Sequence, residues 1–464
     1  MSSNNSKLID ELRTIVGAKG LLSGDMIEAQ SERFSDQDGA NSAFILRPSS
    51  ADELSNLMKV LHRFKQPVAI QGGLTGLVDG ATIGAGEIAL SLERMKKVIS
   101  INAPNRTMIV EAGATIQHVQ EAAEAEGLMF AADWGARGSA TVGGGIACNA
   151  GGNAVLRYGM MREQVLGLEV VLSDGSVLSS MNSMLKSNAG YDLKQLFIGS
   201  EGTLGIVSKA VLRLRPLFDK RATALVSVSN FDRVAKLLAA MDKFLGGSLS
   251  AFEVMWGDFY QLMLSLSGKQ ALLPVGSNFY VLIESSGANE EVEQLNFQYA
   301  LEQAYEAELV EDAVVSASET QRSAIWTIRD DVELVFKEFE PVKIFDVSLE
   351  IQFMEQYVSI VNEKMIKAFP DSRGVVFGHL ADGNLHFCWG LGGGEDVDDR
   401  AAKIMYESLE RFGGSISAEH GIGREKRKYL SITRSELEVE WMKKLKSLFD
   451  PECILNRGRV FSVR

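Results

Sequence analysis

Residues 378–386 read Gly-His-Leu-Ala-Asp-Gly-Asn-Leu-His and, together with Glu419-His420, contain three of the five histidines of the chain. Asp-Gly between two apolar runs predicts a two-residue hairpin turn, because both residues tolerate the positive φ of a type I′ turn. With this turn, His379 faces His386 directly across the two strands. Directly paired residues have Cβ atoms about 4.5 to 5.5 Å apart. The two imidazoles could therefore converge on one ion.

Two imidazoles and one carboxylate, with a further position open, are what a catalytic zinc site requires, and Mn²⁺ or Fe²⁺ accept the same ligands. Glu419 is the expected third ligand, because it lies in a strand-like run that glycines allow to turn sharply. His420 would then lie beside the metal without binding it. The alternative is that these groups are satisfied polar residues of a core. His62 and His118, in helical stretches with no other ligand type nearby, are expected to be structural or solvated.

The composition sets the class of protein. A length of 464 residues suggests about three units or two large ones, and 46% hydrophobic with 23% charged residues is typical of globular proteins. The net charge of −14 argues against nucleic acid or an anionic membrane as a partner. Three widely spaced cysteines favour a reducing compartment. Since neither a signal peptide nor a membrane-spanning run is evident, we expect a cytoplasmic protein without a transmembrane segment.

Glycines gather in three patches, at residues 72–76, 138–152 and 199–205. The first follows an apolar strand but does not have the G-x-G-x-x-G spacing, so a nicotinamide site is poorly supported. Glycine lets backbone N–H groups approach a phosphate without interference from side chains. Three such patches within one stretch fit a bound dinucleotide better than coincidence.

The remaining patterns suggest how the chain is organised. Asp174-Gly175 predicts a second hairpin, and Ser50 with Glu53 predicts the start of a helix. Pro216 and the charges at residues 219–221 mark a boundary. Beyond it, strands alternate with amphipathic helices, which suggests a sheet with helices on one face. The last segment, from Asp450, is too short for a domain and must pack on another part of the chain.

Taken together, the motifs resemble those of FAD-dependent D-2-hydroxyacid dehydrogenases with the vanillyl-alcohol oxidase fold, in particular the D-2-hydroxyglutarate dehydrogenase branch. The resemblance implies an α+β protein with a PCMH-type FAD-binding domain and a cap domain whose antiparallel sheet is covered by helices. The expected bounds are 1–217 for the FAD domain, 218–424 for the cap and 425–464 for a C-terminal segment packing back on the FAD domain. The motifs that carry it are residues 135–139, 149–152, 191–205, the His379/His386 hairpin and residues 417–421.

The resemblance also implies roles for single residues. The loop from Gly72 and the segment from Ser139 would hold the pyrophosphate of FAD, and Asn456 would lie near the flavin ring. Thr75 stands where flavin-linking members carry histidine, so FAD is expected to be non-covalent, and Gly145 stands where asparagine is usual. The complete set of expected cofactor-binding residues is Gly72, Gly73, Leu74, Thr75, Gly76, Ser139, Thr141, Gly143, Gly144, Asn149, Gly202, Gly205, Ile206 and Asn456.

In the cap, Arg329 resembles the arginine that binds a substrate carboxylate. A helical salt bridge to Glu333 is its alternative role. Glu333 replaces a family threonine, and Ile344 stands where a lysine is usual, with Lys343 beside it. Cys388 replaces an asparagine. These departures do not identify which residue would bind the distal end of the substrate.

The implied reaction is oxidation of a D-2-hydroxy acid, of the D-2-hydroxyglutarate, D-malate or D-lactate class, to the 2-oxo acid. His420 would take the hydroxyl proton while a hydride passes to the flavin, and the metal would polarise the hydroxyl. Electron-transfer flavoprotein or a quinone-linked carrier would suit as the electron acceptor. Two alternatives stay open: a zinc-dependent hydrolase, if the glycine patches are only turns, and a catalytically silent flavin-binding protein.

Overall fold

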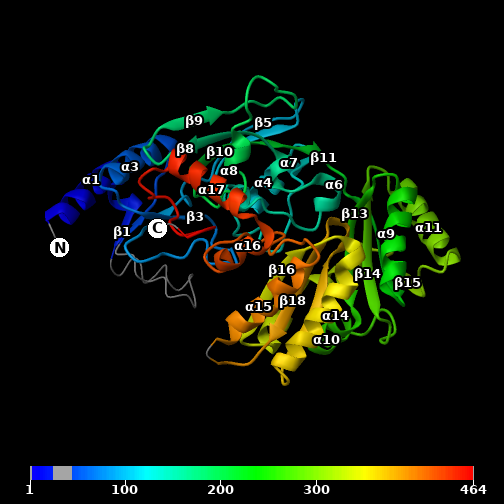
Figure 1. The fold of residues 1–464 in the computed structure, drawn as a ribbon. Coiled ribbons are helices and arrows are strands. Elements are labelled where there is room, and N and C mark those ends of the chain that lie inside the picture. The colour runs from blue at the N-terminus through cyan, green and yellow to red at the C-terminus, as the bar shows by residue number, and fades with distance from the viewer. Residues whose placement is uncertain (1–2, 24–43, 395, 463–464) are drawn as a thin grey trace. The chain divides into compact units, whose positions relative to one another are not determined.

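The computed structural model describes residues 3–23, 44–394 and 396–462. Packing divides the chain into two compact units (Figure 1). The first unit comprises residues 1–152, 158–217 and 419–464, and the second comprises 153–157 and 218–418. The chain leaves the first unit after Leu217, where a boundary was expected, and returns at Glu419, six residues earlier than the expected 424/425 boundary. The returning segment is held in the first unit, since the carboxylate of Glu201 accepts the N–H groups of Ile422 and Gly423, each at 2.8 Å.

The first unit contains two main sheets. One is four-stranded with the order β1-β2-β4-β3, in which β4 is parallel to both β2 and β3. The other is five-stranded and antiparallel, with the order β5-β6-β10-β8-β9. The strands are β1 (Leu21–Ser23), β2 (Phe44–Leu46), β3 (Val68–Gln71), β4 (Ile88–Ser91), β5 (Val98–Asn102), β6 (Thr107–Glu111), β8 (Val165–Val171), β9 (Val177–Ser180), β10 (Ile206–Arg213), and the short pair β7 (Leu128–Met129) and β11 (Arg215–Pro216).

Helices surround these sheets, and α3 (Ala51–Arg63) shows how the sequence forms them. The predicted cap is confirmed, because the side chain of Ser50 accepts the N–H of Glu53 at 3.1 Å. Its apolar side, which includes Leu54, Leu57 and Leu61, is fully buried. Each such side chain contributes about 1.5 to 3 kcal/mol. The other helices of this unit are α1 (Ser3–Gly20), α4 (Ile116–Glu124), α5 (Val142–Cys148), α7 (Met161–Gln164), α8 (Lys194–Phe197), η2 (Arg427–Tyr429), α16 (Leu430–Thr433) and α17 (Glu436–Phe449), and α6 (Val155–Tyr158) lies where the two units meet along the chain.

The C-terminal segment is anchored in the first unit by a buried ion pair on α17. Lys446 pairs with Asp450, and its ammonium group also donates to the carbonyls of Thr203 at 2.8 Å and Leu455 at 2.7 Å. Both charged groups are almost completely buried. Breaking such a pair on one side typically costs about 3 to 5 kcal/mol. The ion pair therefore ties the third glycine patch to the end of the chain.

The second unit is built on one seven-stranded antiparallel sheet with the order β15-β12-β14-β13-β17-β18-β16. Its strands are β12 (Lys220–Val228), β13 (Leu249–Trp256), β14 (Phe279–Gly287), β15 (Asp312–Val315), β16 (Val342–Ser348), β17 (Arg373–His379) and β18 (Asn384–Gly390). Its helices are α9 (Phe231–Leu245), α10 (Gly257–Ser267), α11 (Glu290–Glu306), α12 (Glu319–Asp330), α13 (Glu333–Glu338), α14 (Ile351–Ala368), α15 (Val397–Glu410) and the single turn η1 (Leu380–Asp382).

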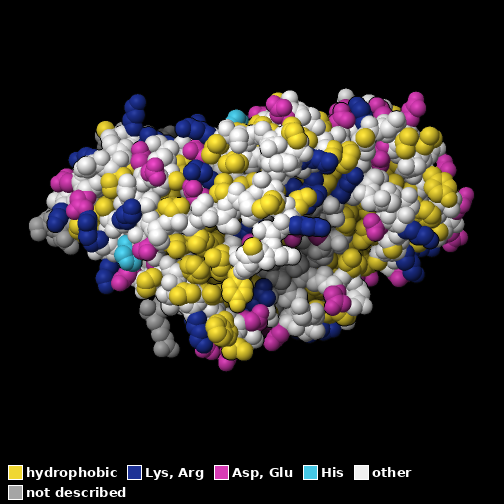
Figure 2. Space-filling model, turned by 90° about the horizontal axis from the view of Figure 1, so that it is seen from above, with side chains coloured by type: hydrophobic (Ala, Val, Ile, Leu, Met, Phe, Trp, Pro, Cys, Tyr) yellow, Lys and Arg dark blue, Asp and Glu magenta, His cyan; other side chains and the backbone are white. Residues whose placement is uncertain are grey.

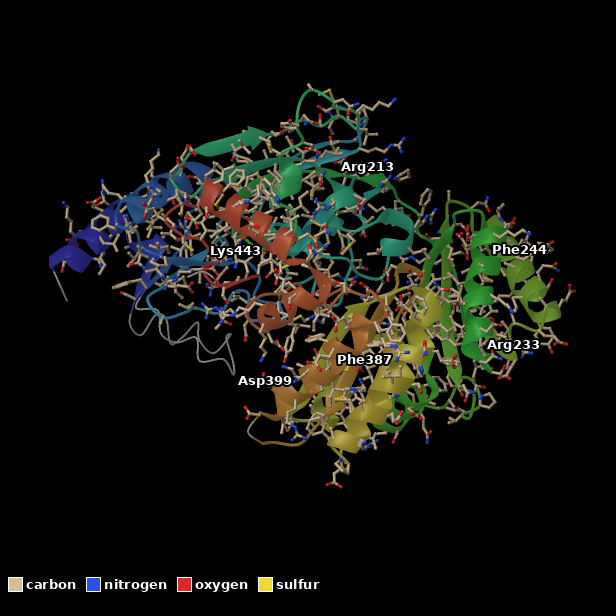
Figure 3. All side chains as sticks on the ribbon, viewed as in Figure 1. Arg213, Arg233, Phe244, Phe387, Asp399 and Lys443 are labelled. Carbon is tan, nitrogen blue, oxygen red and sulfur yellow. The ribbon has the colours of Figure 1, made fainter. Side chains whose placement is uncertain are left out.

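Helices cover both faces of this sheet, so the expectation of helices on one face is wrong. Phe259 of α10 packs on Phe377 of β17 with ring centroids 4.5 Å apart, and Phe377 is paired with His386. Tyr357 of α14 instead packs on Phe387, labelled in Figure 3, at 5.8 Å. Since His386 and Phe387 are consecutive in one strand, they point to opposite faces. The central strands are buried on both faces and read as nearly continuous apolar runs.

The surface shows no single dominant side-chain type on the face drawn in Figure 2, where acidic, basic and hydrophobic side chains all appear. No helix within residues 3–23, 44–394 and 396–462 has the length and hydropathy of a membrane span.

Candidate active site

The histidine hairpin of the second unit forms with a different register from the predicted one. Four residues connect β17 and β18: the turn η1 and Gly383, whose φ is +82°. Phe377 is the partner of His386, so His379 does not face His386 and the predicted two-residue turn is wrong. The reason is that only Gly383 adopts the left-handed conformation, while Asp382 belongs to the helical turn.

The two histidines nevertheless share one face of the sheet, because the register differs by two residues and the side-chain period is two. Their ring centroids are 5.3 Å apart, and their ligand nitrogens lie within 4.8 Å of one another. His379 is 6% exposed and His386 8%. The prediction that both imidazoles lie on one face is therefore confirmed, whereas their direct pairing is wrong, because they are diagonal neighbours.

A buried glutamate on the adjacent strand supports His379. Glu253 of β13 is the direct partner of His379, and its Oε1 lies 2.7 Å from Nδ1 of that ring. Its other oxygen, Oε2, accepts Nε–H of Arg329 at 2.8 Å. Burial opposes ionisation of Glu253, but His379 and Arg329 beside it hold its pKa below the usual range. Glu253 is therefore an ionised carboxylate, which can only accept hydrogen bonds.

These contacts define the tautomer of His379. Nδ1 must carry the proton, because it faces an ionised carboxylate. Nε2 lies 3.3 Å from Nη2 of Arg329, which can only donate, so Nε2 must present a lone pair. These contacts match the tautomer of His379 with the proton on Nδ1 and the lone pair on Nε2, and that lone pair faces Nη2 of Arg329. This is the form that binds a metal, and a carboxylate on the other nitrogen is the usual support for a metal-binding histidine.

Arg329 does not share a helix with Glu333, which corrects the alternative role considered for it. Helix α12 ends at Asp330, and Glu333 begins α13, where its side chain is exposed. Arg329 is only 6% exposed and lies over the ring of Phe377 at 4.9 Å, in addition to its contact with Glu253. Its guanidinium group therefore lies on the histidine face of the sheet.

Asn384 is a polar residue of this face that the sequence analysis did not single out. Continuing the register of β17 and β18 places it opposite His379, and it is 3% exposed. Neither atom of its side-chain amide has a hydrogen-bond partner among the described residues. Buried polar groups are nearly always paired, so an unpaired amide beside two histidines indicates a place for a polar ligand. It lies within the quoted 378–386 motif, but only the pairing of the strands reveals its position.

The segment before Glu419 is fixed to the same face without forming the expected strand. It makes a single bridge, between Ser348 and Ser415. Asp346, the partner of His386 across β16 and β18, accepts the N–H of Ala418 at 2.9 Å through Oδ2. In the first unit, the side chain of Glu419 accepts the N–H of Gly152 at 3.0 Å.

In the first unit, the glycine patches differ from one another. A Cβ on Gly73 would lie 1.9 Å from the carbonyl oxygen of Ser139, so the first two patches meet backbone to backbone. No hydrogen bond within the described residues takes up the backbone N–H groups of Gly73, Leu74, Thr75 or Gly76. Leu74 and its neighbour Leu77 are exposed, at 38% and 50%. A row of free N–H groups beside exposed apolar side chains fits the pyrophosphate and ring system of FAD.

The second and third patches are used mainly for internal packing. The N–H of Gly143 donates to Ala112, and that of Gly144 to the side chain of Thr141, which caps α5. A Cβ on Gly205 would meet Val170 at 2.6 Å, and one on Gly145 would press on Trp134 at 3.1 Å. The other expected cofactor residues lie as follows: Ser139 is exposed, Asn149 ends α5 and accepts the N–H of Arg162, and Ile206 begins β10.

Asn456 connects two segments of the first unit by hydrogen bonds. Its side-chain oxygen accepts the N–H of Ile70 at 2.7 Å, and its nitrogen donates to the carbonyl of Glu201 at 2.7 Å. Its amide therefore joins the strand before the first glycine patch to the third patch. A Cβ on Gly202 would lie 2.8 Å from this amide nitrogen.

Glu201 is another residue that the sequence analysis missed. It has a left-handed backbone (φ 51°), and its carboxylate holds the N–H groups of Ile422 and Gly423, directly after His420-Gly421. Burial raises the pKa of Glu201 although these two N–H groups oppose the shift. Burial also raises the pKa of the nearby Cys148 thiol to about 12, which makes that cysteine unreactive. Glu201 therefore fixes the segment that carries His420.

Comparison with known families and proteins identifies the class. Residues 42–180 match the family described as FAD binding domain, and residues 219–460 match FAD linked oxidases, C-terminal domain. The chain is therefore an FAD-dependent oxidoreductase. It is 37% identical over 427 residues to a D-2-hydroxyglutarate dehydrogenase of Xanthomonas citri pv. viticola, covering 91% of this chain and 89% of the relative. A D-2-hydroxyglutarate dehydrogenase of Stutzerimonas stutzeri is 33% identical, with 98% and 99% covered.

The chain belongs to the FAD-dependent D-2-hydroxyacid dehydrogenase family with the vanillyl-alcohol oxidase fold. Solved structures support the fold. A 4-ethylphenol oxidase from Gulosibacter chungangensis superposes with a TM-score of 0.75 at 16% identity, over 99% of this chain and 98% of the other. A p-cresol methylhydroxylase gives 0.77 at 14% identity, over 100% and 98%. The predicted fold class is thus confirmed.

Proposed function

We propose that this protein oxidises a D-2-hydroxy acid to the 2-oxo acid, with non-covalent FAD and a divalent metal, Zn²⁺, Mn²⁺ or Fe²⁺, as cofactors. The observation that carries the proposal is the histidine face, where His379, supported at Nδ1 by Glu253, lies close to His386 and beside the unpaired amide of Asn384. The two relatives described above, both D-2-hydroxyglutarate dehydrogenases, support the substrate class.

Glu419 is the third metal ligand in this proposal. Ala418 is held by Asp346, the strand partner of His386, and successive Cα atoms lie about 3.8 Å apart. The backbone of Glu419 is therefore covalently tethered one residue from a group fixed beside His386. Two imidazoles and a carboxylate would leave a position on the ion for a substrate oxygen.

When bound, FAD supplies a hydride acceptor and the divalent ion acidifies the substrate hydroxyl. The residues of this chain do the rest. His420 takes the hydroxyl proton on an imidazole nitrogen. Arg329 pairs with a carboxylate of the substrate, because its planar fork matches that group. Asn384 offers donors and an acceptor to the bound oxygens, and the free N–H groups from Gly73 hold the pyrophosphate.

The residues that would lie near the far end of the substrate carry fewer charges than the family pattern implies. Ile344 is the strand partner of Cys388, and the two continue the face beyond His386 with apolar groups. Lys343 pairs with Asp398 at 3.5 Å. We therefore propose D-2-hydroxyglutarate, D-malate and D-lactate as the panel to test, with a shorter or less charged acid as a real candidate. Electron-transfer flavoprotein or a quinone-linked carrier is the proposed electron acceptor.

The decisive experiment is anaerobic bleaching of the flavin by that panel of D-2-hydroxy acids. Bleaching by at least one acid is expected, and its rate should depend on added metal. No bleaching by any acid would favour the catalytically silent flavin-binding protein. The FAD-linked family assignment leaves the zinc-dependent hydrolase without support.

A further inference from the structure

Glu253 contacts both His379 and Arg329, and these two side chains also contact each other. It is 1% exposed. Its Oε1 takes Nδ1–H of His379 at 2.7 Å, and its Oε2 takes Nε–H of Arg329 at 2.8 Å. The third side of the triangle is the 3.3 Å contact between Nη2 of Arg329 and Nε2 of His379. One carboxylate thus holds a proposed metal ligand and a proposed substrate anchor, one on each oxygen.

We propose that Glu253 is a positioning residue that couples metal binding to substrate binding. The inference rests on the proposed roles of His379 as a metal ligand and Arg329 as a carboxylate anchor. Glu253 accepts Nδ1–H of His379, which leaves the lone pair of that ring on Nε2, where a metal ion would take the place of the present contact with Arg329. It also fixes the guanidinium group of Arg329 at the end of α12, over the ring of Phe377. Loss of Glu253 alters both groups at once.

The amide of glutamine cannot reproduce this arrangement. Glu253→Gln keeps one acceptor oxygen but presents NH₂ to the other partner, which is itself a donor. Whichever way the amide turns, either His379 or Arg329 loses its acceptor. If the oxygen faces Arg329, the tautomer of His379 is no longer fixed. If it faces His379, the anchor is released.

The same helix offers a matched control. Arg322, two turns earlier on α12, donates Nε–H to Glu284 of β14 at 2.7 Å. Glu284 is 5% exposed and also accepts from Trp326 at 2.7 Å and Thr223 at 2.8 Å. Glu284→Gln therefore disturbs a buried glutamate that anchors α12 to the same sheet. Within the described residues, Glu284 accepts side-chain hydrogen bonds from Thr223, Arg322 and Trp326 and from no histidine.

The test compares wild type, E253Q, E253D, E284Q and H386A, each with FAD bound. The dissociation constant of Zn²⁺ is measured by competition with a chelator, and anaerobic flavin reduction is followed against D-2-hydroxy acid concentration. E253Q should bind Zn²⁺ roughly 10- to 100-fold more weakly, as losses of such supporting carboxylates typically do. Its half-saturating substrate concentration should also rise. E253D, which keeps the charge, should lie between E253Q and wild type.

The control separates this coupling from simple packing of α12. E284Q should lower the melting temperature as much as E253Q while leaving Zn²⁺ affinity unchanged. Equal loss of Zn²⁺ affinity in E284Q and E253Q would overturn the role of Glu253, and so would wild-type affinity in E253Q. Should E253Q fail to fold, the same comparison is made with E253D.

Wild type and H386A report separately on the proposed function. A wild-type protein that binds none of Zn²⁺, Mn²⁺ and Fe²⁺ overturns both proposals. A wild-type protein that binds Zn²⁺ and loses it in H386A, with E253Q binding as tightly as wild type, overturns the coupling alone.

Discussion

Two buried glutamates show how differently the two units hold their functional groups. Glu201, in the first unit, takes backbone N–H groups of Ile422 and Gly423, and burial raises its pKa. Glu253, in the second unit, takes charged or polar side chains, and they lower its pKa despite burial. The first unit positions its functional segments through backbone N–H groups, and the N–H groups of residues 73–76, which no hydrogen bond within the described residues takes up, fit this pattern. The second unit positions them through side chains, which makes it more sensitive to single substitutions.

The largest effect is expected from His386→Ala, which tests whether side chains of the second unit hold the metal. Removing one of two buried imidazoles should abolish metal content and substrate-driven flavin reduction, while FAD stays bound because its loop belongs to the other unit. Metal analysis and the flavin spectrum measure the two independently. Retention of metal by this variant would show that His386 is not a ligand.

His420→Ala should have the next largest effect. A positioned base typically contributes about 10² to 10⁴-fold, so flavin reduction should slow by that factor with metal and FAD retained. The rate is measured by rapid mixing without oxygen. Loss of metal in this variant would instead place His420 among the ligands.

Gly73→Ala tests whether the backbone of the first glycine patch holds FAD. The added methyl group would lie 1.9 Å from the carbonyl oxygen of Ser139, so the loop must move, at a typical cost of about 1 to 3 kcal/mol. FAD affinity should fall by roughly 5- to 150-fold while metal content stays normal. Gly393→Ala, where a Cβ would meet nothing within 4 Å, is the control. Unchanged FAD affinity in Gly73→Ala would mean that this loop does not hold the cofactor.

The smallest effect concerns pH. Because the pKa of Glu201 is raised in the folded state, the folded protein binds more protons than the unfolded chain between the ordinary glutamate pKa, about 4.3, and the raised folded-state pKa. This group therefore makes stability fall as the pH rises through its folded-state pKa. Glu201→Gln should flatten that dependence in chemical denaturation. An unchanged pH profile would show that Glu201 is as easily ionised as in the unfolded chain.

The sequence predicted what depends on local rules. The cap of α3 at Ser50 and the hairpin at Asp174-Gly175 are confirmed, because turn and cap chemistry involves neighbouring residues. The two histidines were placed on the correct face although the turn was wrong, since a shift of two residues preserves the face.

The misses depend on distant partners. Glu253 is 126 residues from His379, and no local pattern marks it. The unpaired amide of Asn384 becomes visible only when the strands are paired. Glu201 was within a quoted motif, but its contact with Ile422 spans 221 residues. The expectation of helices on one face is wrong because the long apolar runs of the central strands mark burial on both sides.

Anaerobic flavin reduction by D-2-hydroxyglutarate, D-malate and D-lactate, measured on one preparation before and after removal of metal and again after its return, tests the central proposal most directly. The proposal predicts rapid bleaching with metal by at least one acid, little without it, and recovery on adding back Zn²⁺, Mn²⁺ or Fe²⁺. Full-speed reduction of the metal-free protein would contradict it.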